Sequence, residues 1–586
     1  MLFGKPPAPA RALAALIVGL IVVKLSLSSA TAAPASPPIP TCATLAKNPV
    51  FGIAGNHAIK SATSVIVPPA KADVGYCKVS LLYGTNPNQN INIVIGLPLS
   101  RADGGSGGVQ GAWNGRTQGL GGGGCAGNLI VTPAVDAGYV GSGTDLGHAG
   151  GDCESGVNAD GSYNLQFIED FIGNAIKQQV LWSKKIANTY YNLRPAFNYW
   201  NGCSTGGRQG YLLAQELGDE LEGIVANAPA IYWTRFQTAQ MWGQMAMQEL
   251  VGGPISPMKL EQTRASAVAA CDAADGLADG IINDPRSCHF DARANICGAK
   301  NAPVSNCLTS EEANAINLIW DGPRNLHHDK IWFGLDRGSD FSILDGTNPF
   351  FLGVTQFHWD EHDRNFDWRV VTPGQYPQVA QDGSRNIADV TDTFASLDTF
   401  RAHGGKLVTF VGANDQFIYP RGVINYYRTM ALRYSRTDRP DFERLQRFYR
   451  LFDAPGVGHC GIGSTGPVPV DPFGALVKWV EKGVAPDSLL AAGGSAAPPL
   501  GRTRPVCAYP QTALYSGRGS TDDAANFYCG GNLEKRKVVC ADVLVKYKNE
   551  EHGGLSFRES GVDPESCRAH KGFDLDQDEG SDAAED

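Results

Sequence analysis

Short runs of apolar, often β-branched residues alternate with helical segments along most of the chain. Residues 91–95 alternate apolar and polar side chains, as a half-buried strand does, and residues 129–131 begin another apolar run. Similar patterns predict strands at 196–200, 224–226, 407–411 and 448–452, and helices at 212–221 and 473–482. Alternating strands and helices are typical of the α/β class.

The stretch from about Tyr232 to Phe400 interrupts this alternation. It contains four Cys, many aromatic residues and few strand signals. Because connections in α/β proteins are usually about 2–6 residues long, some 165 residues between two core strands predict an inserted domain.

The first 33 residues have the pattern of a secretory signal. Two basic residues precede the apolar run Leu13–Val23, and Ala30-Thr31-Ala32 offers small residues for cleavage. Lys24 ends the run after about 11–12 residues, fewer than the roughly 20 of a membrane-spanning helix. We expect a signal peptide over residues 1–32, a secreted or periplasmic protein, and no membrane contact after cleavage.

The amino-acid composition and charge of the chain exclude some classes of protein and of binding partner. With 43% hydrophobic and 18% charged residues, the chain does not resemble a disordered or RNA-coating protein. Seven of its ten net negative charges lie in residues 574–586, and the rest of the chain is nearly neutral, so nucleic acid is not an expected partner. The even count of 14 Cys indicates disulfides and an oxidising compartment.

Gly202-Cys203-Ser204-Thr205-Gly206 fits G-x-S-x-G, in which a serine lies on a sharp strand-to-helix turn. With 70 Gly in the chain the motif also arises by chance, and the glycines around Ser106 fit it as well. A strand (196–200) precedes Ser204 and a helix (208–217) follows it, whereas Ser106 has neither. Ser204 is therefore the predicted nucleophile.

A serine nucleophile needs a base and a carboxylate that orients the base. In α/β-hydrolases these follow the serine in the order Asp or Glu, then His, each after a strand. Asp415 follows the strand 407–411, and His459 follows the strand 448–452 with one core helix still to come. We predict a triad of Ser204, Asp415 and His459.

Two cysteines lie next to this predicted triad. Cys203 precedes the serine and Cys460 follows the histidine, so the two are close enough to form a disulfide if the triad is assembled. The alternative is that Cys203 is the nucleophile of a Cys-His hydrolase, but a paired thiol cannot attack a substrate.

The sequence resembles the tannase and feruloyl esterase family over about residues 40–530. The resemblance rests on five segments: Trp113–Arg116, Gly121–Gly124, Gly202–Arg208, Gly458–Cys460 and Arg502–Cys507. It implies an α/β-hydrolase core with a large inserted lid domain, the same triad and the Cys203–Cys460 bridge. It also implies an oxyanion hole made by the amides of Gly124 and Thr205, with Gly123 as the alternative in the loop.

The resulting division of the chain has five parts. They are a signal peptide (1–32), the first part of the core (33–231), the lid with a calcium loop (232–400), the second part of the core with a C-terminal segment (401–548), and an acidic tail (549–586).

Three carboxylates within residues 272–279 of the lid, with two glycines, suit Ca²⁺ more than zinc, because calcium prefers oxygen ligands. A solvated acidic loop is the alternative. The resemblance implies side-chain ligands from Asp272, Asp275 and Asp279 and carbonyl ligands from Leu277 and Ile281. We expect a structural Ca²⁺ and no organic cofactor.

Further disulfides follow from the same resemblance. They are Cys42–Cys77, Cys271–Cys288, Cys297–Cys307 and Cys507–Cys529. Connectivity cannot be deduced from sequence for the remaining four cysteines, which we pair as Cys125–Cys153 and Cys540–Cys567.

Aromatic residues of the lid are candidates for substrate binding, with lid core as the alternative: Phe350, Phe351 and Trp359, and with them Phe357 and Trp368. In the family member that hydrolyses mono(hydroxyethyl) terephthalate, a lid arginine grips the substrate carboxylate, and no equivalent can be placed here.

The expected function is that of a secreted serine carboxylic ester hydrolase. Its expected partners are small-molecule esters of aromatic acids, galloyl, feruloyl or related hydroxybenzoate and hydroxycinnamate esters, cleaved through an acyl-enzyme. The alternatives are a mono(hydroxyethyl) terephthalate-type hydrolase, a non-catalytic binding protein on the same fold, and a peptidase or amidase. The sequence does not fix the oligomeric state.

Overall fold

The structure is a computed structural model. It divides into two compact units, residues 1–39 and 40–586, and the fold described below is that of the second unit. The residues that the structure describes are 39–52, 58–69, 74–107, 110–151, 153–300, 302–324, 330–344, 349–392, 396–493 and 500–535, without the side chains of 384 and 388–390. The expected signal peptide, the acidic tail and the Cys540–Cys567 pair lie outside these residues.

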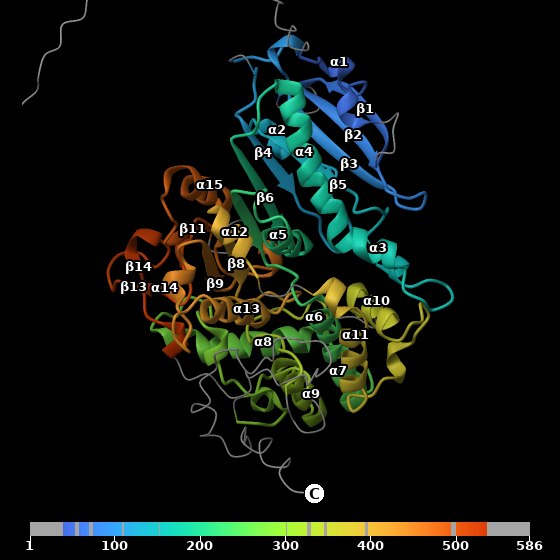
Figure 1. Cartoon of the computed structure of the whole chain (residues 1–586). Coiled ribbons are helices and arrows are strands. Elements are labelled where there is room, and N and C mark those ends of the chain that lie inside the picture. Colours follow the sequence, from blue (N-terminus) through green and yellow to red (C-terminus); the bar gives the residue numbers. More distant parts are fainter. Residues whose placement is uncertain are drawn as a thin grey trace, which may run out of the picture. The chain divides into compact units, whose positions relative to one another are not determined.

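Nine strands of the described chain form one sheet in the order β1-β2-β3-β5-β4-β6-β7-β8-β9 (Figure 1). Strands β1, β2, β3 and β5 pair antiparallel, and from β5 to β9 all neighbours are parallel. The strands are β1 (Ile59–Val67), β2 (Tyr76–Tyr83), β3 (Ile91–Pro98), β4 (Arg116–Leu120), β5 (Val140–Thr144), β6 (Phe197–Cys203), β7 (Gly223–Asn227), β8 (Lys406–Gly412) and β9 (Tyr449–Ala454).

Helices cover both faces of this sheet, as neighbouring residues on β6 show. Trp200 lies against α5, where a Cβ on Gly210 would come within 3.0 Å of its ring. Tyr199 points to the other face, because side chains alternate along a strand, and its hydroxyl donates to Glu481 of α15 at 2.8 Å. The helices on the sheet are α2 (Thr132–Asp136), α4 (Ala175–Tyr191), α5 (Thr205–Glu216) and α15 (Pro472–Lys482).

The chain between β7 and β8 forms helices, turns and two isolated β-bridges in its described residues. Figure 1 shows most of these helices gathered near one end of the strands. They are α6 (Trp233–Gln240), α7 (Trp242–Val251), α8 (Pro257–Cys271), α9 (Ser310–Asp321), α10 (Phe351–Asp360), α11 (Tyr376–Thr391) and α12 (Asp398–His403). We call residues 228–405 the insertion.

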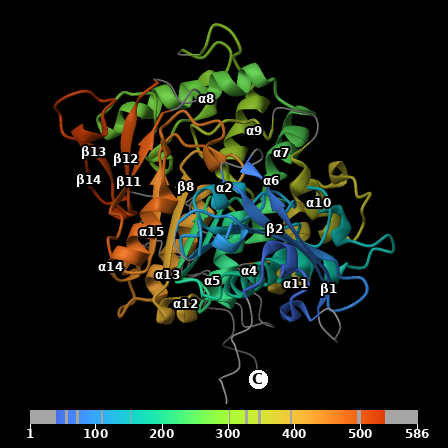
Figure 2. The same cartoon turned by 90° about the horizontal axis from the view of Figure 1, so that it is seen from above.

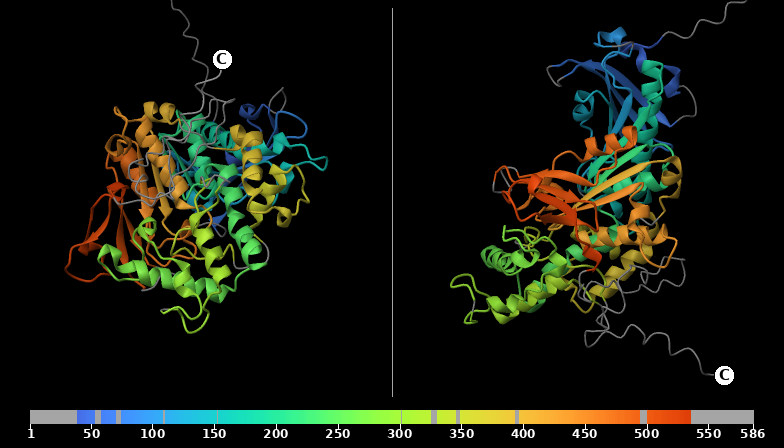
Figure 3. Two further views of the ribbon diagram at one scale, coloured as in Figure 1. Left: turned by 90° about the horizontal axis from the view of Figure 1, so that it is seen from below. Right: turned by 90° about the vertical axis from the view of Figure 1, so that its left-hand side faces the viewer.

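Two small antiparallel sheets follow the large one in sequence. They contain β10 (Val468–Pro469), β11 (Ser488–Ala492) and β12 (Thr503–Cys507), and β13 (Thr512–Tyr515) with β14 (Phe527–Gly530). A bridge between Phe452 and Ala508 places them beside β9, and Figures 2 and 3 show them together on one flank. The remaining α-helices are α1 (Cys42–Leu45), α3 (Leu165–Glu169), α13 (Pro420–Arg433) and α14 (Phe442–Leu445). Within the described ranges, every helix is too short or too polar to cross a lipid bilayer.

The structure confirms the predicted α/β class, and two predicted elements need correction. Residues 129–131 form no strand: the Asn128 side chain accepts from the Ile130 amide at 2.9 Å and bends the chain, so Leu129 and Ile130 are exposed. The helix predicted at 212–221 is α5, which begins at Thr205 and ends at Glu216. Its three glycines obscured the start of the helical pattern.

Candidate active site

Ser204 occupies a sharp turn between β6 and α5. Its backbone has φ 64° and ψ −127°, a conformation that residues with a side chain rarely adopt. The turn is held because the Ser204 amide donates to the Asn227 carbonyl at 3.0 Å. Glycines are required around it: a Cβ on Gly202 would lie 2.4 Å from the Gly206 backbone, and one on Gly207 would lie 2.3 Å from the Asn227 carbonyl oxygen.

His459 and Asp415 form a buried hydrogen-bonded pair after β9 and β8. The His459 Nδ1 lies 2.8 Å from Asp415 Oδ2, and since a carboxylate only accepts, Nδ1 carries the proton. Asp415 is 1% exposed, and its Oδ1 accepts from the amides of Phe417 and Ile418 at 2.9 and 2.7 Å. Burial raises the pKa of Tyr419, and the nearby Asp415 carboxylate adds to this shift. The other ring nitrogen of His459, Nε2, has no hydrogen-bond partner among the described residues.

A disulfide joins the nucleophile turn to the histidine loop. Cys203 and Cys460 are bonded, with a Cα–Cα distance of 6.1 Å across 257 residues of sequence. The residues next to Ser204 and His459 are therefore covalently linked, which brings the two halves of the predicted triad into one region. Because Cys203 is paired, it has no thiolate to serve as an alternative nucleophile.

The backbone amides of Gly124 and Thr205, on either side of the Ser204 turn, are among those without an acceptor in the described part of the chain. The other amides of the glycine-rich loop are all paired. Gly121 donates to the Asn201 carbonyl, Gly122 to Gln209 Oε1, Gly123 to the Ala126 carbonyl and Cys125 to the Gly151 carbonyl. Gly123, the alternative considered from sequence, thus already uses its N–H group.

A row of aromatic rings extends from Gly124 to His459. The centroid of the Phe417 ring lies 5.2 Å from that of the His459 ring and 4.9 Å from that of the Phe350 ring. The ring centroids of Phe350 and Phe351 are 5.0 Å apart. Phe351 is 47% exposed, and a Cβ on Gly124 would lie 3.9 Å from its ring. Phe417 was not predicted, although its place two residues after Asp415 could have indicated it.

Trp359, predicted to contact substrate, is 1% exposed, and its indole N–H donates to the Cys153 carbonyl at 3.0 Å. The structure therefore gives this ring a packing role, because it lies a little over two turns beyond Phe351 on the inward face of α10. Phe357 and Trp368 are likewise buried within a cluster of the insertion.

The same helix is attached to Glu154. Thr355 and His358 each lie 3.0 Å from its carboxylate, and the hydrogen bond from His358 is the main reason that the pKa of Glu154 is lowered. The helix that carries Phe351 is thereby joined to residues next to Cys153.

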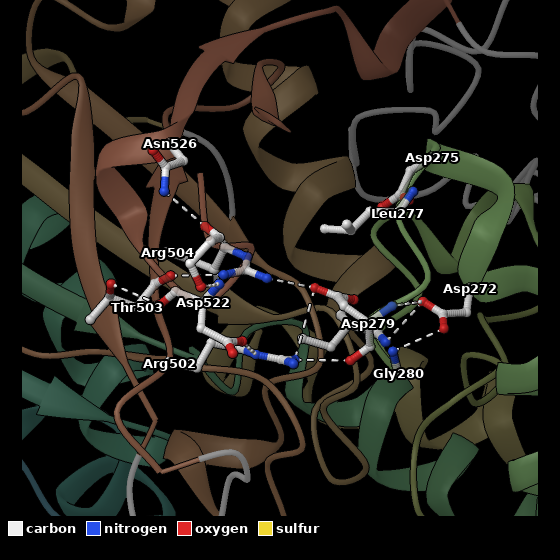
Figure 4. A network of polar contacts seen from close by, with 12 residues as sticks. Asp272, Asp275, Leu277, Asp279, Gly280, Arg502, Thr503, Arg504, Asp522 and Asn526 are labelled. Atoms are coloured by element: carbon white, nitrogen blue, oxygen red, sulfur yellow. Dashed lines mark hydrogen bonds and ion pairs between the residues drawn. The ribbon is translucent and has the colours of Figure 1, made fainter. Parts of the chain in front are cut away.

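The predicted calcium loop is compact, and two of its three carboxylates, those of Asp272 and Asp275, face main-chain amides (Figure 4). The Asp275 carboxylate accepts from the Leu277 amide at 2.9 Å. The Asp272 carboxylate accepts from the amides of Asp279, Gly280 and Ile281 at 3.1, 2.9 and 3.2 Å.

Asp279 is paired with arginines of the C-terminal segment. Its Oδ2 lies 2.7 Å from Arg504 Nη2 and 3.8 Å from Arg502 Nη1 (Figure 4). Among the residues that the structure describes, no three His, Cys, Asp or Glu side chains are grouped as metal ligands. The oxygen donors fit calcium in kind, whereas the side chains are directed at other partners. Calcium binding therefore stays a prediction.

The disulfides expected within the described residues are present. Besides Cys203–Cys460, the structure contains Cys42–Cys77, Cys125–Cys153, Cys271–Cys288, Cys297–Cys307 and Cys507–Cys529. The Cys125–Cys153 bond joins the residue after Gly124 to the turn that receives Trp359.

Comparison with known proteins identifies the family. The model of the family "Tannase and feruloyl esterase" matches residues 109–530. The chain belongs to this family. A probable feruloyl esterase of Arthroderma benhamiae is 33% identical over 481 residues, which cover 78% of this chain and 86% of that protein. An uncharacterized esterase of Xanthomonas campestris pv. campestris is 31% identical over 446 residues, covering 68% and 75%.

Solved structures of the family have the same fold. Feruloyl esterase B from Aspergillus oryzae is 24% identical, with a TM-score of 0.69, covering 84% of this chain and 100% of that one. Tannin acyl hydrolase from Aspergillus niger is 22% identical, with a TM-score of 0.73, covering 92% and 100%. As a tannase and feruloyl esterase family member, this protein is a carboxylic ester hydrolase with a small-molecule ester substrate.

Proposed function

We propose that the protein is a serine esterase that cleaves esters of aromatic acids on an α/β-hydrolase core. The observation that carries the proposal is the pair of unpaired amides, Gly124 and Thr205, beside a strained serine and a buried His–Asp pair. The three residues follow the parallel strands β6, β8 and β9, and the carboxyl ends of parallel strands lie at one edge of a sheet.

The chemistry follows from this arrangement. Ser204 Oγ attacks the ester carbonyl while His459 Nε2 takes its proton, and Asp415 holds the imidazole and stabilises its positive charge. The amides of Gly124 and Thr205 donate to the oxyanion that forms. His459 then protonates the leaving alcohol, and water releases the acid from the acyl-enzyme by the same steps.

The row of Phe351, Phe350 and Phe417 supports an aromatic acyl group. An ester bound to the two amides lies between the ends of this row, so a ring attached to its carbonyl can pack against the phenylalanines. The insertion, which supplies two of the three rings, would serve as the lid.

Replacing Phe417 with leucine tests the acyl-group assignment. We expect kcat/KM to fall about tenfold for methyl ferulate and methyl gallate, since an aromatic contact contributes roughly 0.5–1.5 kcal/mol beyond its area, and to change little for ethyl butyrate. Phe473→Leu, in the cluster under α15, is the matched control. Equal losses on aromatic and aliphatic esters would contradict the assignment. Including chlorogenate and mono(hydroxyethyl) terephthalate in the panel decides between the substrate classes.

A structural Ca²⁺ in the loop 272–281 is a further part of the proposal. Asp272 and Asp275 would hold it with loop carbonyls, and the ion would stabilise the insertion without taking part in the reaction. At a free concentration 100 times its Kd, a bound ion stabilises the folded state by about 2.7 kcal/mol. We expect EGTA to lower Tm and added Ca²⁺, not Mg²⁺, to restore it. Asp275→Asn should abolish this response and Asp291→Asn should not; a Tm insensitive to EGTA would count against calcium.

Export to an oxidising compartment completes the proposal. Six disulfides within the described residues are typical of secreted or periplasmic proteins, because cytosolic thiols are kept reduced.

A further inference from the structure

Gln209 is a buried residue of α5 whose side chain contacts the glycine-rich loop. It is 0% exposed, and its Oε1 accepts from the Gly122 amide at 3.1 Å. Its Nε2 has no hydrogen-bond partner among the described residues. A buried donor left unpaired costs free energy that an apolar side chain of similar volume, such as methionine, would not. The glutamine therefore contributes its side-chain oxygen, which accepts the hydrogen bond from the Gly122 amide.

Besides the bond from Gly122 to Gln209, two further hydrogen bonds hold the glycine-rich loop to α5. The Gly122 carbonyl accepts from the Gly206 amide at 2.9 Å. The backbones approach so closely that a Cβ on Gly121 would lie 2.5 Å from Gly206 Cα. The Thr205 hydroxyl donates to the Gly124 carbonyl at 2.6 Å.

The helix that begins with one oxyanion amide, Thr205, thus also holds the loop that supplies the other. Gln209 provides the side-chain acceptor in this connection, one turn into the helix. Without it the Gly122 amide would be unpaired, and one of the three hydrogen bonds that hold the loop to α5 would be lost.

We propose that Gln209 is a positioning residue for ester hydrolysis, which holds the Gly124 amide at the separation from the Thr205 amide that the oxyanion requires. The inference rests on the proposed function. Oxyanion donors act when they lie about 2.7–3.1 Å from the charge that develops in the transition state. A displacement of about 1 Å can cost about 100-fold in rate.

Gln209→Met removes the acceptor and keeps the volume. We expect kcat for methyl ferulate to fall about 10- to 100-fold, with KM changed less than about twofold, because the amides act in the transition state. An aryl boronic acid forms a tetrahedral adduct with Ser204 whose oxygen faces the same amides. Its Ki should rise by the factor by which kcat/KM falls, while the Ki of ferulic acid stays within about twofold.

Gln446→Met is the control, since it also removes a hydrogen bond between a glutamine side chain and the backbone, here donated by Gln446 Nε2 to the Tyr509 carbonyl at 2.8 Å, elsewhere in the fold. It should retain kcat. An unchanged kcat in Gln209→Met, or equal weakening of boronate and ferulate inhibition, would overturn the inference. A serine-directed phosphonate separates failure of this inference from failure of the proposed function. If only the inference fails, Ser204 is still labelled in the wild type and in Gln209→Met; if the proposed function fails, Ser204 is labelled in neither.

Discussion

Ser204→Ala is expected to reduce kcat for methyl ferulate by about 10⁵-fold or more, because removal of the attacking hydroxyl leaves only binding and the oxyanion amides. Tm should not fall, since the hydroxyl has no structural hydrogen bond among those that hold the turn. The measurement is steady-state hydrolysis together with a thermal unfolding curve. Substantial residual hydrolysis of gallate, ferulate and p-nitrophenyl esters would refute the serine mechanism.

Ser106→Ala is the matched control for this experiment. Ser106 lies in the second G-x-S-x-G match, in an exposed stretch without a following α-helix, and its loss should leave kcat unchanged. A serine-directed phosphonate should label Ser204 and not Ser106. Absence of any labelling would favour a non-catalytic binding protein instead, and cleavage of amides as well as esters would favour the peptidase alternative.

Removing the Cys203–Cys460 disulfide, by Cys203→Ser with Cys460→Ser, should produce the largest loss of stability. A bond that closes a loop of 257 residues stabilises the fold by roughly 3–5 kcal/mol. Activity should fall about 100-fold even well below the lowered Tm, because the serine turn and the histidine loop are no longer held within about 1 Å of their working positions.

The control is removal of Cys297–Cys307, which closes 10 residues within the insertion. It should lower stability by roughly 2–3 kcal/mol and leave kcat unchanged below its Tm. Denaturant unfolding and kcat at matched fractions folded distinguish the two bonds. Full activity in the Cys203→Ser, Cys460→Ser protein would show that the bond stabilises the fold without positioning the triad.

Most residues of the proposed site could be singled out from the sequence because their surroundings depend on local sequence. The glycines around Ser204 are dictated by close backbone contacts, and a strand before them with a helix after them is readable from the pattern. Asp415 and His459 each follow an apolar strand, in the chain order Ser, Asp, His that was expected for this type of site. The pairing of their neighbours Cys203 and Cys460 could be expected for the same reason.

What the sequence missed depends on hydrogen bonds and packing contacts that no sequence pattern shows. The preference for Gly124 over Gly123 in the proposed oxyanion hole rests on which amide is already paired, and Gly123 donates to the Ala126 carbonyl. From its sequence context Phe417 is expected in a turn. Its position beside His459 depends on packing against Phe350. Trp359 was predicted to contact substrate, but its ring is buried against Cys153 and the turn that follows it. The sequence does not show this contact.

The Cys203–Cys460 bond has a further consequence for the integrity of the chain. The whole chain between Ser204 and His459, including the insertion, lies inside one covalent ring. A protease that cuts a surface turn of the insertion opens this ring without producing separate fragments. A nicked molecule therefore keeps Ser204 and His459 on one covalent body, and migrates as two pieces only after reduction.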